Sequence, residues 1–200
     1  NADVQYLGAG QTKLETFSVL SADGTSHDIV ITITGTNDVP VIAGDDTGAV
    51  TEDASTPNLT DTGTLTIVDA DGGQAVFQTT GITSSAGALG SLSITSAGAW
   101  TYTVANADVQ YLAAGETKVE TFTVLSADGT SHDIVITITG TNDVPVITGD
   151  ATGAVTEDAT TPNLTDTGTL SIVDADGGQA VFQTTGITAS ASALGSLSIT

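Results

Sequence analysis

Two aspartates separated by one alanine occur twice in this chain, each time after an apolar segment. The sequence IVDADGGQ covers residues 67–74 and again residues 172–179, with a glycine pair directly after the second aspartate. Carboxylates at positions i and i+2 beyond a strand can converge on one cation, and the glycines permit the turn that this requires. Ca²⁺ takes about six to eight oxygen ligands from carboxylates, carbonyls and water. Asp69 and Asp71 are therefore candidate calcium ligands, although they could also form an ordinary solvated turn.

Further oxygen-bearing side chains accompany this pair. Asn37 and Asp38 precede a proline, Glu52 ends an apolar run, and Asp128 lies in the sequence SADGT. Glu52 could instead be a solvated charge at a strand end, and Asp128 suits a hairpin turn without any ion. The EF-hand loop is not matched, because the glutamate at its twelfth position is missing. The nine-residue glycine-rich β-roll repeat is also absent.

The charge balance points to the same class of partner. The chain has 24 acidic residues against two lysines, Lys13 and Lys118, and a formal net charge of -22. Such a charge favours solubility but destabilises a compact state through self-repulsion, which a divalent cation would relieve. A nucleic-acid partner is excluded, because no basic patch is present to meet phosphates.

The remaining composition is typical of a folded β protein. Hydrophobic residues make up 39% of the 200 residues, and disordered chains lack such a hydrophobic content. Thr, Val, Ile and Gly dominate, as in strands and turns. The absence of cysteine fits a secreted protein that folds without oxidation. No apolar run is long enough to span a bilayer, so direct membrane insertion is not expected.

Catalysis is not expected either. Ser131, His132 and Asp133 are neighbours on one predicted strand, where side chains alternate between faces and cannot form a triad. We expect His132 to be an exposed strand residue and Trp100 to belong to the core. The remaining acidic residues of interest are expected at the solvated surface; these are Asp45, Asp46, Asp61 and Asp166.

The chain repeats itself with an offset of 105 residues. Residues 1–95 align with 106–200 without a gap and differ at ten positions. A unit of this length is domain-sized, so the sequence predicts a tandem array of domains. With boundaries at TNDVP, where proline blocks strand continuation, residues 1–36 end one repeat, 37–141 form a complete repeat and 142–200 open the next. The chain is expected to be a window on a longer protein, or its two partial repeats complement each other between chains, although together they lack the equivalent of residues 96–105.

Within the complete repeat the pattern predicts strand after strand. Ile134, Ile136 and Ile138 alternate with polar or smaller residues, as expected of a half-buried strand. One segment, NADVQYLAAGE, predicts a short helix with Asn106 as its N-cap and Gly115 as its stop. Short strands with regular turns predict an all-β Greek-key β-sandwich with one short helix per repeat. The predicted strands are 39–43, 47–52, 63–69, 74–83, 90–96, 98–105, 118–126 and 131–140.

The order of the motifs resembles a known family. TNDVPVI, VTEDA, TIVDADGGQ and LSADGTSHDIVITITGTND follow each other as in the cadherin repeat. AWTYTVANADVQYLAAGETKVETFTVLSADGT and ITGTND are similar to the VCBS repeat, a cadherin-like module found in tandem in giant RTX-type bacterial surface adhesins. The resemblance implies Ig-like sandwich domains with calcium held between successive domains. The second acidic motif of cadherin repeats, which supplies a further glutamate in mid-domain, has no clear counterpart.

The resemblance also implies a function and a ligand set. The function is that of a calcium-rigidified spacer, which projects a binding domain from a bacterial cell surface and contacts neighbouring repeats as its partners. Alternatives are a filament subunit that assembles head-to-tail, and a homophilic or glycan-binding adhesive module. The ligands implied in the complete repeat are Asn37, Asp38, Glu52, Asp69, Asp71 and Asp128. At the next junction they are Asn142, Asp143, Glu157, Asp174 and Asp176.

Overall fold

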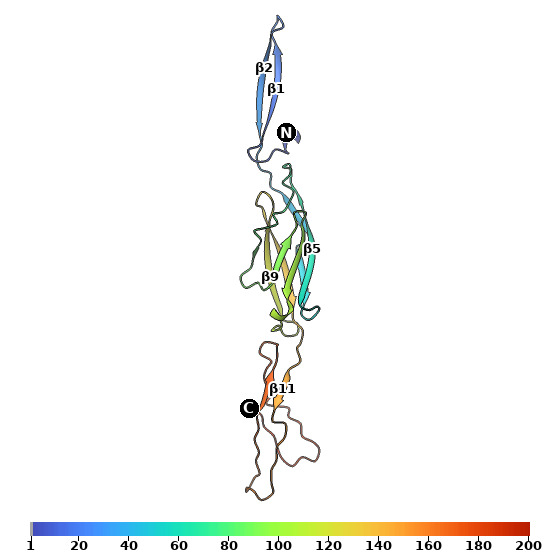
Figure 1. Cartoon of the computed structure of the whole chain (residues 1–200), viewed down its shortest axis with the longest axis vertical. Coiled ribbons are helices and arrows are strands. Elements are labelled where there is room, and N and C mark those ends of the chain that lie inside the picture. Colours follow the sequence, from blue (N-terminus) through green and yellow to red (C-terminus); the bar gives the residue numbers. More distant parts are fainter. Residues whose placement is uncertain (1) are drawn as a thin grey trace.

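The computed structural model describes residues 2–200 and places three segments along one long axis (Figure 1). The central segment, residues 37–141, carries a hairpin segment (residues 2–36) at one end and a third segment (residues 142–200) at the other. No helix in residues 2–200 is long and apolar enough to cross a membrane.

Two four-stranded sheets make up the central segment. In the first sheet all neighbouring strands are antiparallel; its order is β3 (Val41–Gly44), β5 (Asn58–Val68), β8 (Ala99–Ala105) and β7 (Ser91–Ile94). In the second sheet β4 runs parallel to β10; its order is β4 (Thr47–Thr51), β10 (Ser131–Thr139), β9 (Thr117–Leu125) and β6 (Thr83–Ser84).

The inner faces of both sheets form one core. Trp100 and Tyr102 of the first sheet are 1% and 0% exposed, and Ile134, Ile136 and Ile138 of the second are all 0% exposed. The predicted alternation of these residues and the core position of Trp100 are confirmed. Burial of side chains of this size is the main favourable term in folding, because it removes apolar surface from water.

Seven of the predicted strands of the repeat occur as β3, β4, β5, β7, β8, β9 and β10. The prediction starts β5 too late, at Gly63, because glycine inside a run suggests a break. Here glycine fits the strand, since an added Cβ would lie 2.3 Å from the Trp100 ring on neighbouring β8. A small residue is thus required where the ring crosses the strand.

The strand predicted at residues 74–83 is wrong, since only its last residue lies in a strand, β6. Neighbouring N–H groups of this segment bond to different sheets. Phe77 donates to the carbonyl of Ser96 in the turn after β7 (3.0 Å), and Gln78 donates to the carbonyl of Leu125 in β9 (2.8 Å). The segment therefore crosses from one sheet to the other at the end of the sandwich.

The predicted short helix is also wrong. Its place is taken by a three-residue 3₁₀ turn, η2 (Asn106–Asp108). The N–H groups of Val109 and Leu112 donate three residues back, to the carbonyls of Asn106 (3.2 Å) and Val109 (3.0 Å). Asn106 caps no helix, because its side chain bonds to Asp53 instead. Spacing of three residues buries Val109 and Leu112 without any helical turn of 3.6 residues.

The strand pairs of the two outer segments keep the register of their counterparts in the central one, but the third segment is only partly alike. Residues 151–169 and 174–200 form no strand, whereas their counterparts in the central segment include β4, the first part of β5, β6 and β7. After η1 (Ala2–Val4), β1 (Thr12–Leu20) pairs with β2 (Ser26–Thr34) in the register of β9 and β10. At the other end, β11 (Val146–Gly149) pairs with β12 (Leu170–Val173) in the register of β3 and β5. The strands predicted at 28–35 and 168–174 are thus found as β2 and β12. Asn1 lies outside the described residues.

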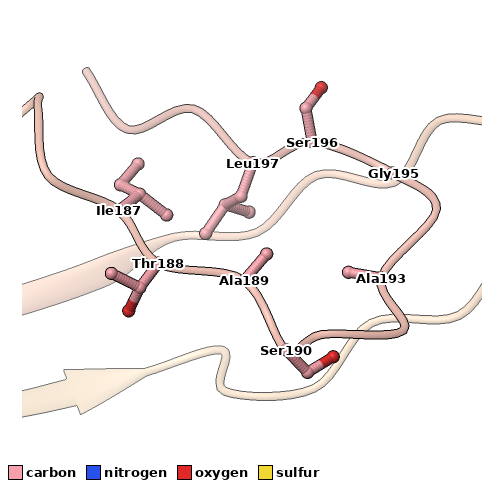
Figure 2. A pocket seen from close by; sticks show the side chains of 8 residues that line it. All are labelled: Ile187, Thr188, Ala189, Ser190, Ala193, Gly195, Ser196 and Leu197. Atoms are coloured by element: carbon pink, nitrogen blue, oxygen red, sulfur yellow. The ribbon is translucent and has the colours of Figure 1, made fainter.

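The third segment contains an open hollow where its sandwich would continue (Figure 2). Ala189, Ala193 and Leu197 point into the space between the two arms of the loop, and Leu197 is 74% exposed. Leu92, the counterpart of Leu197 in the central segment, packs against the core. In the central segment the counterparts of these two arms pair with β9 and β8, and residues 142–200 contain no counterpart of either strand. Its lining consists of Ile187, Thr188, Ala189, Ser190, Ala193, Gly195, Ser196 and Leu197.

Candidate metal-binding junctions

All of the predicted ligands except Glu157 lie at the two ends of the central segment. The first junction, between residues 2–36 and the central segment, forms around the loop after β5. The Asp38 N–H donates to Oδ2 of Asp71 (2.9 Å), and the Asp71 N–H donates to Oδ1 of Asp69 (2.9 Å). Nδ2 of Asn37 donates to Oδ2 of Asp128 (3.1 Å). These five residues are therefore brought together at one end of the sandwich.

Asp128 forms the hairpin turn that the sequence suggested, and it also contacts the linker. Its carboxylate accepts hydrogen bonds from the hydroxyl group of Ser126 and from the N–H and hydroxyl groups of Thr130, which close its own hairpin turn. Burial of the carboxyl group opposes ionisation, but the hydrogen bonds from Ser126, Asn37 and Thr130 outweigh it and lower the pKa of Asp128 to about 2. The side chain thus connects this turn to the linker through Asn37.

The second junction, between the central and third segments, repeats this arrangement. The Asp143 N–H donates to Oδ2 of Asp176 (3.2 Å), and the Asp176 N–H donates to Oδ1 of Asp174 (3.0 Å). Nδ2 of Asn142 donates to the carbonyl of Asp143 (2.7 Å). Residues 142–200 contain no counterpart of Asp128.

Glu52 lies at the second junction and not with Asp69 and Asp71, the other acids of its own repeat. Its side chain is 1% exposed, and its Oε2 accepts the N–H of Thr141 in the linker (2.9 Å). Glu157, its counterpart one repeat later, is exposed, and no contact described within residues 2–200 joins it to the Asp174–Asp176 pair. Strand β4 ends at the opposite end of the sandwich from the loop that contains Asp69 and Asp71. Glu52, which follows β4, therefore belongs to the junction after its own repeat.

Negative charge accumulates at the second junction. Burial raises the pKa of Glu52, and the charges of Asp143, Asp53 and Asp176 raise it further despite the Thr141 hydrogen bond. The pKa of Asp143 is also raised, by burial and then by the charges of Asp53, Asp176 and Asp174. Both shifts mean that ionisation is opposed while nothing positive lies nearby. Neither lysine relieves this, since Lys13 pairs with Glu15 (3.5 Å) and no ion pair of Lys118 occurs among residues 2–200.

Each junction contains carboxylate oxygens that are buried and lack a hydrogen-bond partner. Asp71 and Asp176, which are 1% and 2% exposed, each leave Oδ1 without a partner, and Oδ2 of Asp69 and of Asp143 are in the same state. Unpaired buried oxygens are costly, so they call for a positive partner. Hard oxygen donors suit Ca²⁺. In residues 2–200 no three Asp, Glu or His side chains already form a metal-holding group, so an ion would require these carboxylates to turn toward one another.

Direct backbone contacts also cross the junctions. The Gly72 N–H donates to the carbonyl of Tyr6 (2.9 Å), and the Gly177 N–H donates to the carbonyl of Tyr111 (2.9 Å). Gly140 passes so close to the same turn that an added Cβ would lie 2.2 Å from the Leu112 carbonyl oxygen. The turn in NADVQYL therefore contacts both the linker and the next repeat.

Three residues of the second junction were not among the predicted site residues, namely Asp53, Asn106 and Gln110. Asp53 is left-handed (φ 60°), and Asn106 fixes it by accepting its N–H (2.9 Å) and donating to its Oδ1 (2.8 Å). Nε2 of Gln110 donates to Oε1 of Glu52 (2.8 Å) and to Oδ1 of Asp53 (3.0 Å). Hydrogen bonds from Asn106 and then Gln110 lower the pKa of Asp53. A sequence signal was available, because TED (51–53 and 156–158) and NADVQYL (1–7 and 106–112) both recur unchanged with the 105-residue offset.

The residues assigned to the surface take structural contacts of their own. Asp61, at the sheet edge, accepts the Ala49 N–H at Oδ2 (2.7 Å), and Asp166 accepts the Ala154 N–H in the same way (2.7 Å). Nε2 of His132 lies 3.4 Å from Oδ2 of Asp46, whereas Oδ1 of Asp133 accepts a hydrogen bond from the Thr123 hydroxyl group (2.6 Å). Ser131, His132 and Asp133 therefore do not act as a unit.

The sandwich, its linker motif and the acidic junctions together match a known family. A profile of the bacterial cadherin-like domain matches residues 37–140, just over half of the chain. The chain belongs to this family. Among solved structures, the sialic acid binding region of a Streptococcus sanguinis SK1 adhesin bound to 3'sLn is similar, with 15% identity and a TM-score of 0.33 over 62% of this chain. The cadherin-like chain covers 37% of that adhesin chain. No curated protein matches the sequence of the present chain.

Proposed function

We propose that this bacterial cadherin-like chain is a non-catalytic, calcium-rigidified spacer of a large extracellular adhesin, of the VCBS type found in RTX adhesins. The observation that carries the proposal is the pair of acidic junctions, each with buried carboxylate oxygens that lack a partner. Their position between successive repeats suits a cation that stiffens the array. Near-identity of the repeats supports a spacer, which needs length rather than individual surfaces.

The chain's own residues would prepare each junction for the ion. A bound Ca²⁺ would supply the positive charge that the junctions lack. Asp69 and Asp71, or Asp174 and Asp176, would hold it together with the linker acids Asp38 or Asp143, with Glu52 added at the second junction. Asp71 already orients the linker through the Asp38 N–H, and Tyr6 holds the Gly72 backbone across the junction. The neighbouring repeats of the chain are thus its proposed partners, on the outside of a bacterial cell.

The test is the distance between the outer segments. The chain has no cysteine, so Ser26→Cys and Ser190→Cys allow two fluorophores to be attached specifically. We expect a narrow distribution of transfer efficiencies in millimolar Ca²⁺ and a broad one in EDTA, because repulsion at the junctions returns. Equal widths in both conditions would rule out rigidification by calcium.

A second candidate function, head-to-tail assembly of separate chains, is favoured by exposed apolar side chains on the outer segments, such as Phe17 and Leu197. The hollow of the third segment matches the site where Leu89 and Gly90 donate their N–H groups to Glu120 in the central segment (2.7 and 3.1 Å). Glu15 is the counterpart of Glu120 and lies on the exposed hairpin. Such a joint would lack the counterpart of β8, so we expect it to be weak. Sedimentation at rising concentration, with Glu15→Ala as the control, distinguishes assembly from a monomeric spacer.

A further inference from the structure

The polar turn that follows β8 makes an unusual contact with the acids of the second junction. One amide nitrogen, Nε2 of Gln110, donates to Glu52 (2.8 Å) and to Asp53 (3.0 Å) at the same time. Without this shared donor the two neighbouring carboxylates would repel each other. The amide therefore occupies the place between two anions where a cation would be most stable.

The rest of the turn holds this arrangement in position. Asn106, which is 7% exposed, forms two reciprocal hydrogen bonds with Asp53 and keeps it in a left-handed conformation that side chains rarely adopt. The carbonyl of Tyr111, next to Gln110, accepts the Gly177 N–H of the following repeat. Gln110 is thus attached to an element that touches both the acids and the neighbouring domain.

We propose that Gln110 is a positioning residue that latches Glu52 and Asp53 together in the ion-free junction and must release them before they can turn toward a cation. This inference rests on the proposed calcium function. A neutral amide contributes only the positive end of a dipole, so it moderates the repulsion without cancelling the charge. The latch therefore stabilises the ion-free state and competes with ion binding.

Two substitutions test the latch. Gln110→Ala removes the side chain, and Gln110→Met keeps its length but removes the donor. Both are made in the full chain carrying Asp69→Asn and Asp71→Asn, so that the calcium response reports the second junction. We expect both variants to melt earlier than the parent in EDTA and to bind Ca²⁺ about fivefold more tightly, or ~1 kcal/mol, by calorimetry.

The matched control is Gln78→Ala, since the Gln78 amide donates to a neutral backbone carbonyl, that of Ser126 (2.8 Å). It should lower the melting temperature equally in EDTA and in calcium and leave the affinity unchanged. If Gln110 were merely structural, its variants would behave like this control, and if it were a ligand, they would bind Ca²⁺ more weakly. Either result overturns the latch. An unsubstituted chain without any calcium response would instead overturn the proposed function.

Discussion

The hairpins β1–β2 and β9–β10 have nearly the same sequence but opposite environments. Phe17 is 54% exposed and its counterpart Phe122 only 2%, and Ile31 is 45% exposed while Ile136 is fully buried. Both hairpins nevertheless keep the same register and the same turn. The difference teaches that register is fixed locally, by the turn and the antiparallel ladder, whereas burial depends on the opposite sheet.

The largest expected effect is on the core. Ile136→Ala should cost about 2–5 kcal/mol of unfolding free energy, because it leaves a cavity between two packed sheets. Ile31→Ala, the same change in the exposed hairpin, should cost less than about 0.5 kcal/mol. Urea unfolding of both variants measures this difference. Equal losses would mean that another chain covers the hairpin in solution.

The next effect compares the two junctions. Calcium at a hundredfold excess over its Kd should stabilise the chain by roughly 2.7 kcal/mol per site. Asp174→Asn with Asp176→Asn should remove more of this response than Asp69→Asn with Asp71→Asn, because only the second junction also has Glu52 and Asp53. Melting curves in EDTA and in calcium provide the measurement. A larger loss from the first pair would reverse our ranking of the junctions.

A smaller effect is expected from the buried glutamate of β9. Glu120 is fully buried and accepts hydrogen bonds from two backbone N–H groups and from the Tyr102 hydroxyl group (2.9 Å). Burial and the Glu120 hydrogen bond raise the pKa of Tyr102, so it remains a donor. Glu120→Gln places an amide donor against these donors and should cost about 2 kcal/mol. Glu15→Gln, on the exposed hairpin, should cost less than about 1 kcal/mol in the same urea titration, since it removes only a surface ion pair.

The smallest effect is on the pH dependence of folding stability in EDTA. Acidification should stabilise the second junction through Glu52 and destabilise the first through Asp128. The pKa of Glu52 is raised above 4.5, so its protonation stabilises the fold as pH falls toward that value. The pKa of Asp128 is lowered from 3.8 to about 2, so its contribution is present above 3.8 and is lost as pH falls toward 2. We expect apparent stability to rise and then fall on acidification. Glu52→Gln should flatten the rise, and Asp128→Asn the fall; variants without these effects would contradict the assignment.

The fold was predictable from sequence wherever one face of a strand packs against the core and the other does not. Ile134, Ile136 and Ile138 alternate because their strand packs on a single sheet, and strands of this kind were found within a few residues. The error at 74–83 arose because this segment crosses between the sheets: it buries Phe77 and partly buries Gln78, but only its last residue lies in a strand. The expected helix failed because a spacing of three between Val109 and Leu112 is compatible with 3₁₀ turns as well.

The candidate junctions were only partly predictable. The Asp-Ala-Asp motif predicted Asp69 and Asp71 as candidate ligands, since two carboxylates so close in sequence suggest a cation site. Which pole of the sandwich Glu52 occupies depends on the direction of β4, and this follows from its parallel pairing with β10. Gln110 and Asn106 are uncharged, and their role becomes visible only when the turn is folded against Asp53.

The parallel pairing of β4 with β10 also determines how the central segment responds to tension. The hairpin segment and the third segment are attached at opposite ends of the central segment's long axis (Figure 1), so a pull between neighbouring repeats runs along the strands. The ladder between residues 47–51 and 135–139 then lies across the pull. Its hydrogen bonds are loaded together in shear, whereas a hairpin pulled apart from one end breaks them one at a time. The strand order thus makes the domain a mechanically resistant link in an extended chain.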